Sequence, residues 1–186
     1  MRRFAPWGIR SAAIFLALFL AYVGLVGVRA FYPIAYTAQI AALAEEYGLD
    51  PELIGAVVRC ESRFDVHAVS PRGAIGLMQL MPETGSWIAE QLAVPDFRAE
   101  QLSDAALNLR LGTWYLRHLL DRFGSREVAL AAYNAGPSHA ERWVLGIGSP
   151  FPETRAYVER VARAVPIYRI YYRAPWLLTI TPCVLL

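Results

Sequence analysis

The chain has 186 residues, of which 56% are hydrophobic and 18% charged, and its formal net charge is +2. Its basic side chains are scattered rather than striped, so the sequence predicts no nucleic-acid partner. Once an N-terminal targeting segment is set aside, about 150 residues remain, which is enough for one domain with a real hydrophobic core.

The N-terminal segment, residues 1–30, is predicted to direct export. Residues 11–28 form an uncharged apolar run that reaches the lower length limit for a membrane-spanning helix. Three arginines precede this run, which predicts that the N-terminus stays inside and the rest of the chain lies outside. Two export interpretations stay open: an uncleaved signal anchor, or a signal peptide removed after Ala30. A buried core helix is the structural alternative.

The next part of the chain, residues 31–170, is predicted to form one mainly α domain. Asp50 and Pro51 are the residue types that begin a helix, and Gly48 is typical of the end of the helix before it. The pattern of apolar residues predicts a long amphipathic helix between Asp104 and Gly124. Further helices are expected over residues 34–47, from 51 to about 61 or 62, from 82 to about 92, from Ser125 through 132, and from Pro137 and Pro152 onward.

Residues 63–80 break this helical pattern. They include Pro71, Gly73 and Gly76, which predict an ordered loop or a short sheet. Gln79 could hydrogen-bond the hydroxyl and acetamido groups of a sugar, and two methionines could form a soft apolar wall. The alternative is a glycine-rich turn that is followed by core methionines, Met78 and Met81.

Glu61 is the first candidate for chemistry, because it follows an apolar helical stretch and precedes Phe64. Burial at that point would raise the pKa of the carboxyl, so that it holds a proton near neutral pH. A protonated carboxyl can donate to a glycosidic oxygen while the bond breaks. A solvated surface glutamate is the alternative on local sequence alone. Asp65 lies four residues later, but the loop that follows argues against a direct catalytic role for it.

Three sequence motifs resemble those of the lytic transglycosylases of the soluble-lytic-transglycosylase type. The first begins with Glu61-Ser62-x-Phe64 and continues through the glycine-rich stretch at residues 68–84. The second is Ala-Tyr-Asn-Ala-Gly-Pro at residues 132–137, and the third is Pro-Glu-Thr-Arg-x-Tyr-Val at residues 152–158. They follow the family's order and cover about residues 36–165, so the resemblance spans most of the predicted domain.

The resemblance implies a lysozyme-like, mainly helical fold and cleavage of the bond between N-acetylmuramic acid and N-acetylglucosamine in peptidoglycan. Glu61 stands at the position of the family's single catalytic acid and base, and no metal or cofactor is implied. Core packing is the alternative for each of the two tyrosines, and tying down the loop around Gly136 is the alternative for the asparagine. The positions that would line the groove or support the glutamate are Ser70, Gln79, Met81, Tyr133, Asn134 and Tyr157.

The family chemistry needs one carboxylate rather than two. Glu61 would protonate the leaving oxygen and then accept a proton from the C6 hydroxyl of the same muramic acid, which closes a 1,6-anhydro ring. A goose-type-lysozyme-like hydrolase, in which water attacks instead, and a non-catalytic glycan-binding scaffold are the competing functions. The expected partners are peptidoglycan glycan strands, the membrane through the N-terminal helix, and an unidentified envelope machine. The expected location is the inner membrane facing the periplasm, or the periplasm itself after signal cleavage.

The remaining candidates are weaker. Cys60 and Cys183 lack metal-ligand spacing and form either one disulfide or two small buried side chains. Residues 171–186 are an apolar tail that packs on the domain or contacts a membrane surface or a partner. The three histidines are dispersed and are interpreted as structural or solvated: His67, His118 and His139.

Overall fold

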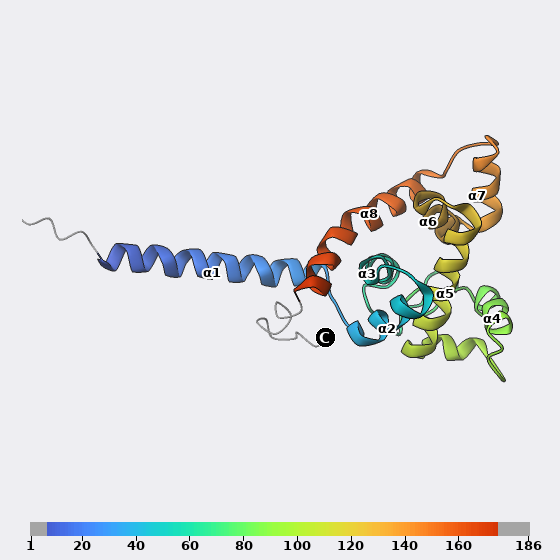
Figure 1. Ribbon diagram of the computed structural model, residues 1–186, viewed down its shortest axis with the longest axis horizontal. Coiled ribbons are helices and arrows are strands. Elements are labelled where there is room, and N and C mark those ends of the chain that lie inside the picture. Colours follow the sequence, from blue (N-terminus) through green and yellow to red (C-terminus); the bar gives the residue numbers. More distant parts are fainter. Residues whose placement is uncertain (1–6, 175–186) are drawn as a thin grey trace, which may run out of the picture.

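The computed structural model describes the backbone of residues 7–174 and is helical over most of that range (Figure 1). No strand is present within these residues, and isolated bridges join Ile75 to Val69 and to Leu80. The expected mainly α class is confirmed. The elements are α1 (Trp7–Phe31), α2 (Thr37–Tyr47), α3 (Pro51–Glu61), α4 (Pro82–Gln91), the 3₁₀ helix η1 (Ala99–Ser103), α5 (Ala105–Phe123), α6 (Arg126–Ala135), α7 (Pro137–Val144) and α8 (Pro152–Arg173).

The helix boundaries follow the predicted signals closely. Prolines occupy the first turn of α3, α4, α7 and α8, where their missing N–H costs nothing. Gly48 and Gly124 end α2 and α5 at positive φ, 62° and 65°. Two boundaries differ from the expectation. α2 begins at Thr37 instead of residue 34 because Tyr36 adopts a left-handed conformation, and α6 continues to Ala135.

Helix α3 runs through the centre of the body, and α8 packs along it (Figure 1). Ile54, Val57 and Val58 of α3 are fully buried. Gly55 makes the close approach of α8 possible, because a Cβ atom there would lie 3.0 Å from the Tyr168 ring. The helix that ends in Glu61 is therefore held in the core on several sides.

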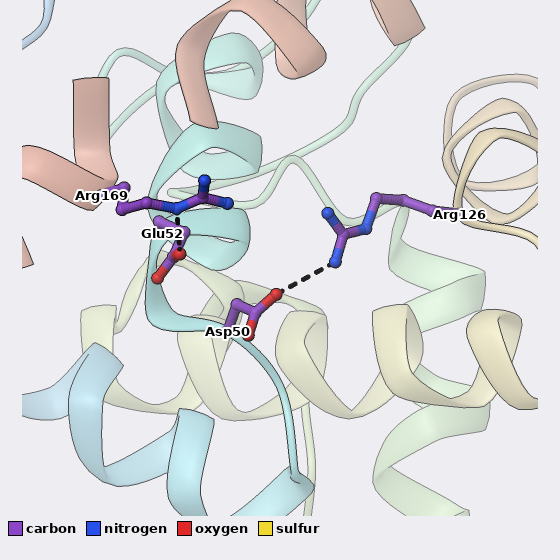
Figure 2. Close-up of polar contacts among 4 residues, drawn as sticks. All are labelled: Asp50, Glu52, Arg126 and Arg169. Atoms are coloured by element: carbon purple, nitrogen blue, oxygen red, sulfur yellow. Dashed lines mark hydrogen bonds and ion pairs between the residues drawn. The ribbon is translucent and has the colours of Figure 1, made fainter. Parts of the chain in front are cut away.

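Two ion pairs join the first turn of α3 to its neighbours (Figure 2). Arg126 of α6 lies 3.0 Å from the Asp50 carboxylate, and Arg169 of α8 lies 2.9 Å from the Glu52 carboxylate. The arginines and Asp50 are largely solvent-exposed, so each pair contributes at most about 1 kcal/mol. Each pair joins the start of α3 to a helix that lies far away in sequence.

Helix α1 projects away from the body of the domain (Figure 1). Residues Ser11–Phe31 have a mean hydropathy of 2.3, and none of this stretch is buried inside the protein. That exposure contradicts the core-helix alternative and fits a membrane span or a signal sequence by length and composition. At the other end, α8 continues without a break to Arg173 and buries Tyr171. Residues 171–173, which were expected to begin the apolar tail, therefore belong to the helix. The rest of the expected tail, including Cys183, lies outside the described residues.

Candidate active site

A groove of about 450 Å³ opens beside the end of α3. Its walls come from the α3 end, the 70–84 segment, α5 and the α6–α7 junction. Six of the predicted site residues line it: Glu61, Ser70, Gln79, Met81, Tyr133 and Asn134. The seventh, Tyr157 on α8, is 1% exposed and lies behind Glu61 rather than in the groove wall. The structure therefore brings all seven into one neighbourhood.

Glu61 is the last residue of α3, and the chain turns sharply after it. Arg63 and Phe64 both adopt positive φ values, 56° and 68°. Ser62 secures the turn, since its Oγ donates to the Leu77 carbonyl at 2.8 Å and accepts from the Phe64 N–H at 3.1 Å. The catalytic candidate is thus fixed at the junction between the core helix and the loop that forms the groove wall.

The environment of Glu61 is set to keep its carboxyl protonated near neutrality. Burial raises its pKa from 4.5 to about 7, while the Tyr157 hydroxyl and the charge of Arg160 act in the opposite direction. The Tyr157 hydroxyl lies close enough to influence the carboxyl, yet it has no partner at full hydrogen-bonding geometry. This contact is therefore a loose one, and burial is the dominant cause of the raised pKa of Glu61.

This pKa has a consequence for stability that can be measured. The folded state holds a proton on Glu61 between pH 4.5 and about 7 whereas the unfolded state has lost it, so stability falls as pH rises through that window. Glu61→Gln cannot ionise, so its melting temperature should exceed that of the wild type at about pH 8, with a smaller difference at about pH 5. Thermal unfolding of both proteins, with Glu90→Gln on exposed α4 as the control, checks this. An equal difference at both pH values would contradict the assignment.

The loop that carries the groove wall is held from beneath by two side chains that lie far away in sequence. The Tyr133 hydroxyl donates to the Met78 carbonyl at 2.8 Å. Asn108 of α5 is fully buried, accepts from the Met78 N–H at 2.8 Å, and donates to the carbonyls of Ile75 and Leu102 at 2.9 and 2.8 Å. Sequence reasoning missed Asn108. Its signal is a polar residue on the apolar face of an amphipathic helix, where asparagine is unfavourable without partners.

Two glycines allow the loop to approach α5. A Cβ atom on Gly76, which has φ 81°, would lie 2.4 Å from both Asn108 Nδ2 and the Leu102 carbonyl. A Cβ atom on Gly112 would lie 2.5 Å from the sulfur of Met78. Met78 is accordingly a core residue, as the structural alternative held, whereas Met81 is 36% exposed and lines the groove.

Gln79 and Ser70 serve the loop as well as the groove wall. Gln79 has φ 49°, and its Nε2 donates to the carbonyls of Ala68 and Gly76 at 3.0 Å. The Ser70 hydroxyl accepts from the Ala74 N–H at 2.9 Å. Both side chains therefore shape the loop first, and a bound sugar would meet what remains of their hydrogen-bonding capacity.

The other polar candidates differ in whether they line the groove. Asn134 is half-buried and lines the groove beside Gly136. Asp65 accepts from the His67 N–H at 2.9 Å within a turn and does not line the groove. His118 stacks on Trp114 with ring centroids 5.2 Å apart. Among the residues that the structure describes, no group of three His, Cys, Asp or Glu side chains could hold a metal ion.

A helical body whose core helix ends in a half-buried glutamate that faces a groove has the arrangement of a lysozyme-like domain. The Transglycosylase SLT domain model matches residues 38–149, and the chain belongs to this family. The resemblance seen in the three sequence motifs is thereby confirmed.

Named relatives share part of their length with this chain. The soluble lytic murein transglycosylase of Salmonella typhimurium is 33% identical over 155 residues, which cover 76% of this chain and 23% of the relative. The transglycosylase of Enterobacteria phage PRD1 is 40% identical over 101 residues, covering 54% and 35%. The crystal structure of an inactive mutant of lytic transglycosylase Slt from Pseudomonas aeruginosa superposes with a TM-score of 0.70 at 36% identity, covering 77% and 25%. The chain thus spans about a quarter of the length of the soluble lytic relatives.

Proposed function

We propose that this protein cleaves the glycan strands of peptidoglycan as a lytic transglycosylase, at the bond between N-acetylmuramic acid and N-acetylglucosamine. The observation that carries the proposal is the Glu61 carboxyl, which is buried at the groove with a pKa of about 7. Relatives that are named soluble lytic murein transglycosylases support the substrate class.

One carboxyl performs both proton transfers in the proposed reaction. Protonated Glu61 donates to the glycosidic oxygen, the bond from that oxygen to C1 of the muramic acid breaks, and N-acetylglucosamine leaves as the alcohol. The substrate's acetamido group stabilises the positive C1. The Glu61 carboxylate then takes the proton of the C6 hydroxyl, whose oxygen attacks C1 and closes the 1,6-anhydro ring. Glu61 ends protonated again, and no water is consumed.

The composition of the groove favours this scheme over the two-carboxylate mechanism of ordinary glycosidases. Within the described residues, Glu61 is the one acidic side chain that lines the groove. Both inverting and retaining glycosidases with paired carboxylates need a second one across the scissile bond. A goose-type-lysozyme-like hydrolase, which activates water, is the competing enzyme. A glycan-binding scaffold would have no use for an acid held near neutral pKa.

We assign the remaining groove residues to binding and positioning. Gln79 and Asn134 present amide groups at the wall, which suits sugar hydroxyl and acetamido groups. Met81 supplies an apolar surface, and Ser70 holds the loop that forms part of the groove wall. Tyr133 and Tyr157 lie next to Glu61. Both phenols stay protonated, because burial and the neighbouring Glu61 charge raise their pKa values.

We further propose that α1 is an uncleaved anchor in the inner membrane, with the domain, residues 31–170 and the end of α8, facing the periplasm. The support is the exposed apolar span that ends at Phe31, preceded in sequence by arginines. A relative named membrane-bound lytic murein transglycosylase C, from Actinobacillus pleuropneumoniae, is 32% identical over 113 residues. The proposed partners are peptidoglycan and the bilayer, with no nucleic acid; an envelope machine would be a further partner.

The pH dependence of cleavage tests the function. Because the first step needs protonated Glu61, the rate of release of soluble fragments from purified cell walls should fall about tenfold per pH unit above pH 7. Measurements on the full chain in detergent, from about pH 5 to 9, check this. A rate that keeps rising to pH 9 would contradict the role of Glu61 as the acid.

A further inference from the structure

The end of α1 is bonded to the body of the domain by side chains of α3 and α8, although the chain itself continues through the irregular residues 32–36 before α2. Both Nε and Nη2 of Arg59 donate to the carbonyl of Phe31, the last residue of α1, at 3.2 and 3.1 Å. The same guanidinium lies over the ring of Tyr32, 5.0 Å from its centroid. A cation at the carboxyl end of a helix is favourable, because the last carbonyls lack partners and carry partial negative charge.

Helix α8 closes the joint from the other side. The Tyr168 hydroxyl donates to the Pro33 carbonyl at 2.6 Å, and the Tyr171 hydroxyl donates to the Tyr32 carbonyl at 3.4 Å. The Tyr32 and Tyr168 rings also meet edge to face at 6.5 Å. We call the set Tyr32, Pro33, Arg59, Tyr168 and Tyr171 the collar.

The collar and Glu61 are connected through α3, which carries both Arg59 and Glu61. Arg59 and Glu61 lie two residues apart at the end of α3, so about 3 Å of helical rise separates them. Tyr168 packs against Gly55 on the same helix and against Phe64 just beyond it, with ring centroids 6.0 Å apart. The end of α1 and the Glu61 side chain are therefore attached to one rigid, buried helix.

The position of the collar coincides with the end of the apolar span. The stretch Ser11–Phe31 is long enough to cross a bilayer, and the collar begins at the next residue. Tyr32 and Arg59 are partly exposed and are residue types that favour a membrane–water interface, whereas Tyr168 and Tyr171 are buried. In Figure 1 the carboxyl ends of α1 and α8 meet at this point, while α4 and α7 lie at the far side of the body.

We propose that the collar holds α1 rigidly against the domain, so that the bilayer sets the height of Glu61 and limits cleavage to glycan strands that lie close to the membrane surface. The limit on cleavage rests on the proposed function, whereas the rigid joint between α1 and the domain does not depend on catalysis. Arg59, Tyr32 and Tyr168 are positioning residues in this scheme, because they touch neither substrate nor the reacting atoms.

The joint is tested by a distance measurement in lipid nanodiscs on the full chain. Spin labels at Leu18 of α1 and Glu90 of α4, introduced as non-natural amino acids so that Cys60 stays native, should give one narrow distance distribution. The Tyr32→Ala/Arg59→Gln variant should give a broad one. Arg163→Gln, which removes an arginine of an exposed ion pair on α8, should match the wild type. A broad wild-type distribution, or a collar variant that stays narrow, would overturn the rigid joint.

The proposed limit of cleavage to strands near the membrane is tested by varying the distance between the glycan and the bilayer. A twelve-residue Gly/Ser insertion between Ala30 and Phe31 adds roughly 20 Å of flexible tether. Glycan strands are attached to lipids of the same vesicles through stiff, proline-rich spacers of graded length. The wild type should lose about tenfold in rate once the spacer lifts the glycan by roughly that distance, and the insertion variant should not. The same insertion between exposed Gly148 and Ser149 should behave like the wild type.

Free glycan strands in detergent separate the two proposals. The wild type and both insertion variants should cleave them equally, and failure of all three would overturn the proposed function while the distance measurement still decides the joint. Equal rates at every spacer length for the wild type, alongside normal cleavage of free strands, would overturn the limit on reach.

Discussion

Glu61→Gln should lower the rate of cell-wall cleavage by about 10³- to 10⁴-fold, since general acid–base catalysis contributes roughly 10² to 10⁴ and one residue acts in both steps here. Glutamine keeps the size and hydrogen-bonding shape of the side chain but cannot deliver a proton. The variant should remain folded and bind glycan with little change, so the loss should appear in kcat rather than in KM. Release of soluble fragments from purified walls measures it.

Glu83→Gln is the matched control for that loss. Glu83 is an exposed carboxylate at the start of α4, close to the groove but outside the lining that contains Glu61. Its replacement should leave the rate within about twofold of the wild type, because a surface carboxylate contributes little to a proton transfer that it does not reach. A Glu61→Gln enzyme that retains a tenth or more of the wild-type rate would contradict the single-carboxyl mechanism.

Asn108→Ala should destabilise the protein by about 2–6 kcal/mol. It leaves the Met78 N–H and the Leu102 carbonyl without the Asn108 partner, while the Ile75 carbonyl keeps its bond from the Leu80 N–H at 3.1 Å. Each unsatisfied buried group costs about 1–3 kcal/mol. That loss is a large part of the total stability of a domain. Chemical denaturation of the wild type and the variant measures the change in free energy of unfolding.

Asp121→Ala on the same helix is the control for Asn108→Ala. Asp121 pairs with Arg117 at the surface, so its loss should cost at most about 1 kcal/mol. Cleavage should fall with Asn108→Ala even where the protein stays folded, because the loop that forms the groove wall loses its support. If the variant lost less than about 1 kcal/mol, the three hydrogen bonds would not be what holds that loop.

Much of the helical framework could be predicted from local signals. Pro51, Pro82, Pro137 and Pro152 begin helices and Gly48 and Gly124 end them, because proline and glycine restrict or free the backbone regardless of tertiary context. The early start expected for α2 was wrong because packing overrides propensity there. Tyr36 takes a left-handed conformation and packs against the core instead of extending the helix.

The groove wall could not be predicted in the same way. Its shape depends on Asn108 and Tyr133, which lie 30 and 55 residues from the Met78 backbone groups that they bind. Neither contact leaves a local signal near the loop. The family motif marked Gln79 and Ser70 as site residues, but it does not show that their side chains also hold the loop together.

Glu61 shows both what local sequence can predict and what it cannot. The sequence places it at a helix end before an aromatic residue, which is enough to expect partial burial. The pKa of about 7 arises from burial in the folded domain, which outweighs the lowering effects of Tyr157 and Arg160 on α8, almost a hundred residues away in the chain. The collar is a similar case, because Arg59 reaches the end of α1 only once the chain has folded.

Digestion of purified peptidoglycan in oxygen-18-labelled water, followed by mass spectrometry of the fragments, tests the central claim most directly. If the C6 hydroxyl is the nucleophile that Glu61 activates, the new muramic acid ends are 1,6-anhydro rings that contain no label. Reducing ends that carry oxygen-18 would show that water attacks instead, and the intramolecular mechanism would be wrong.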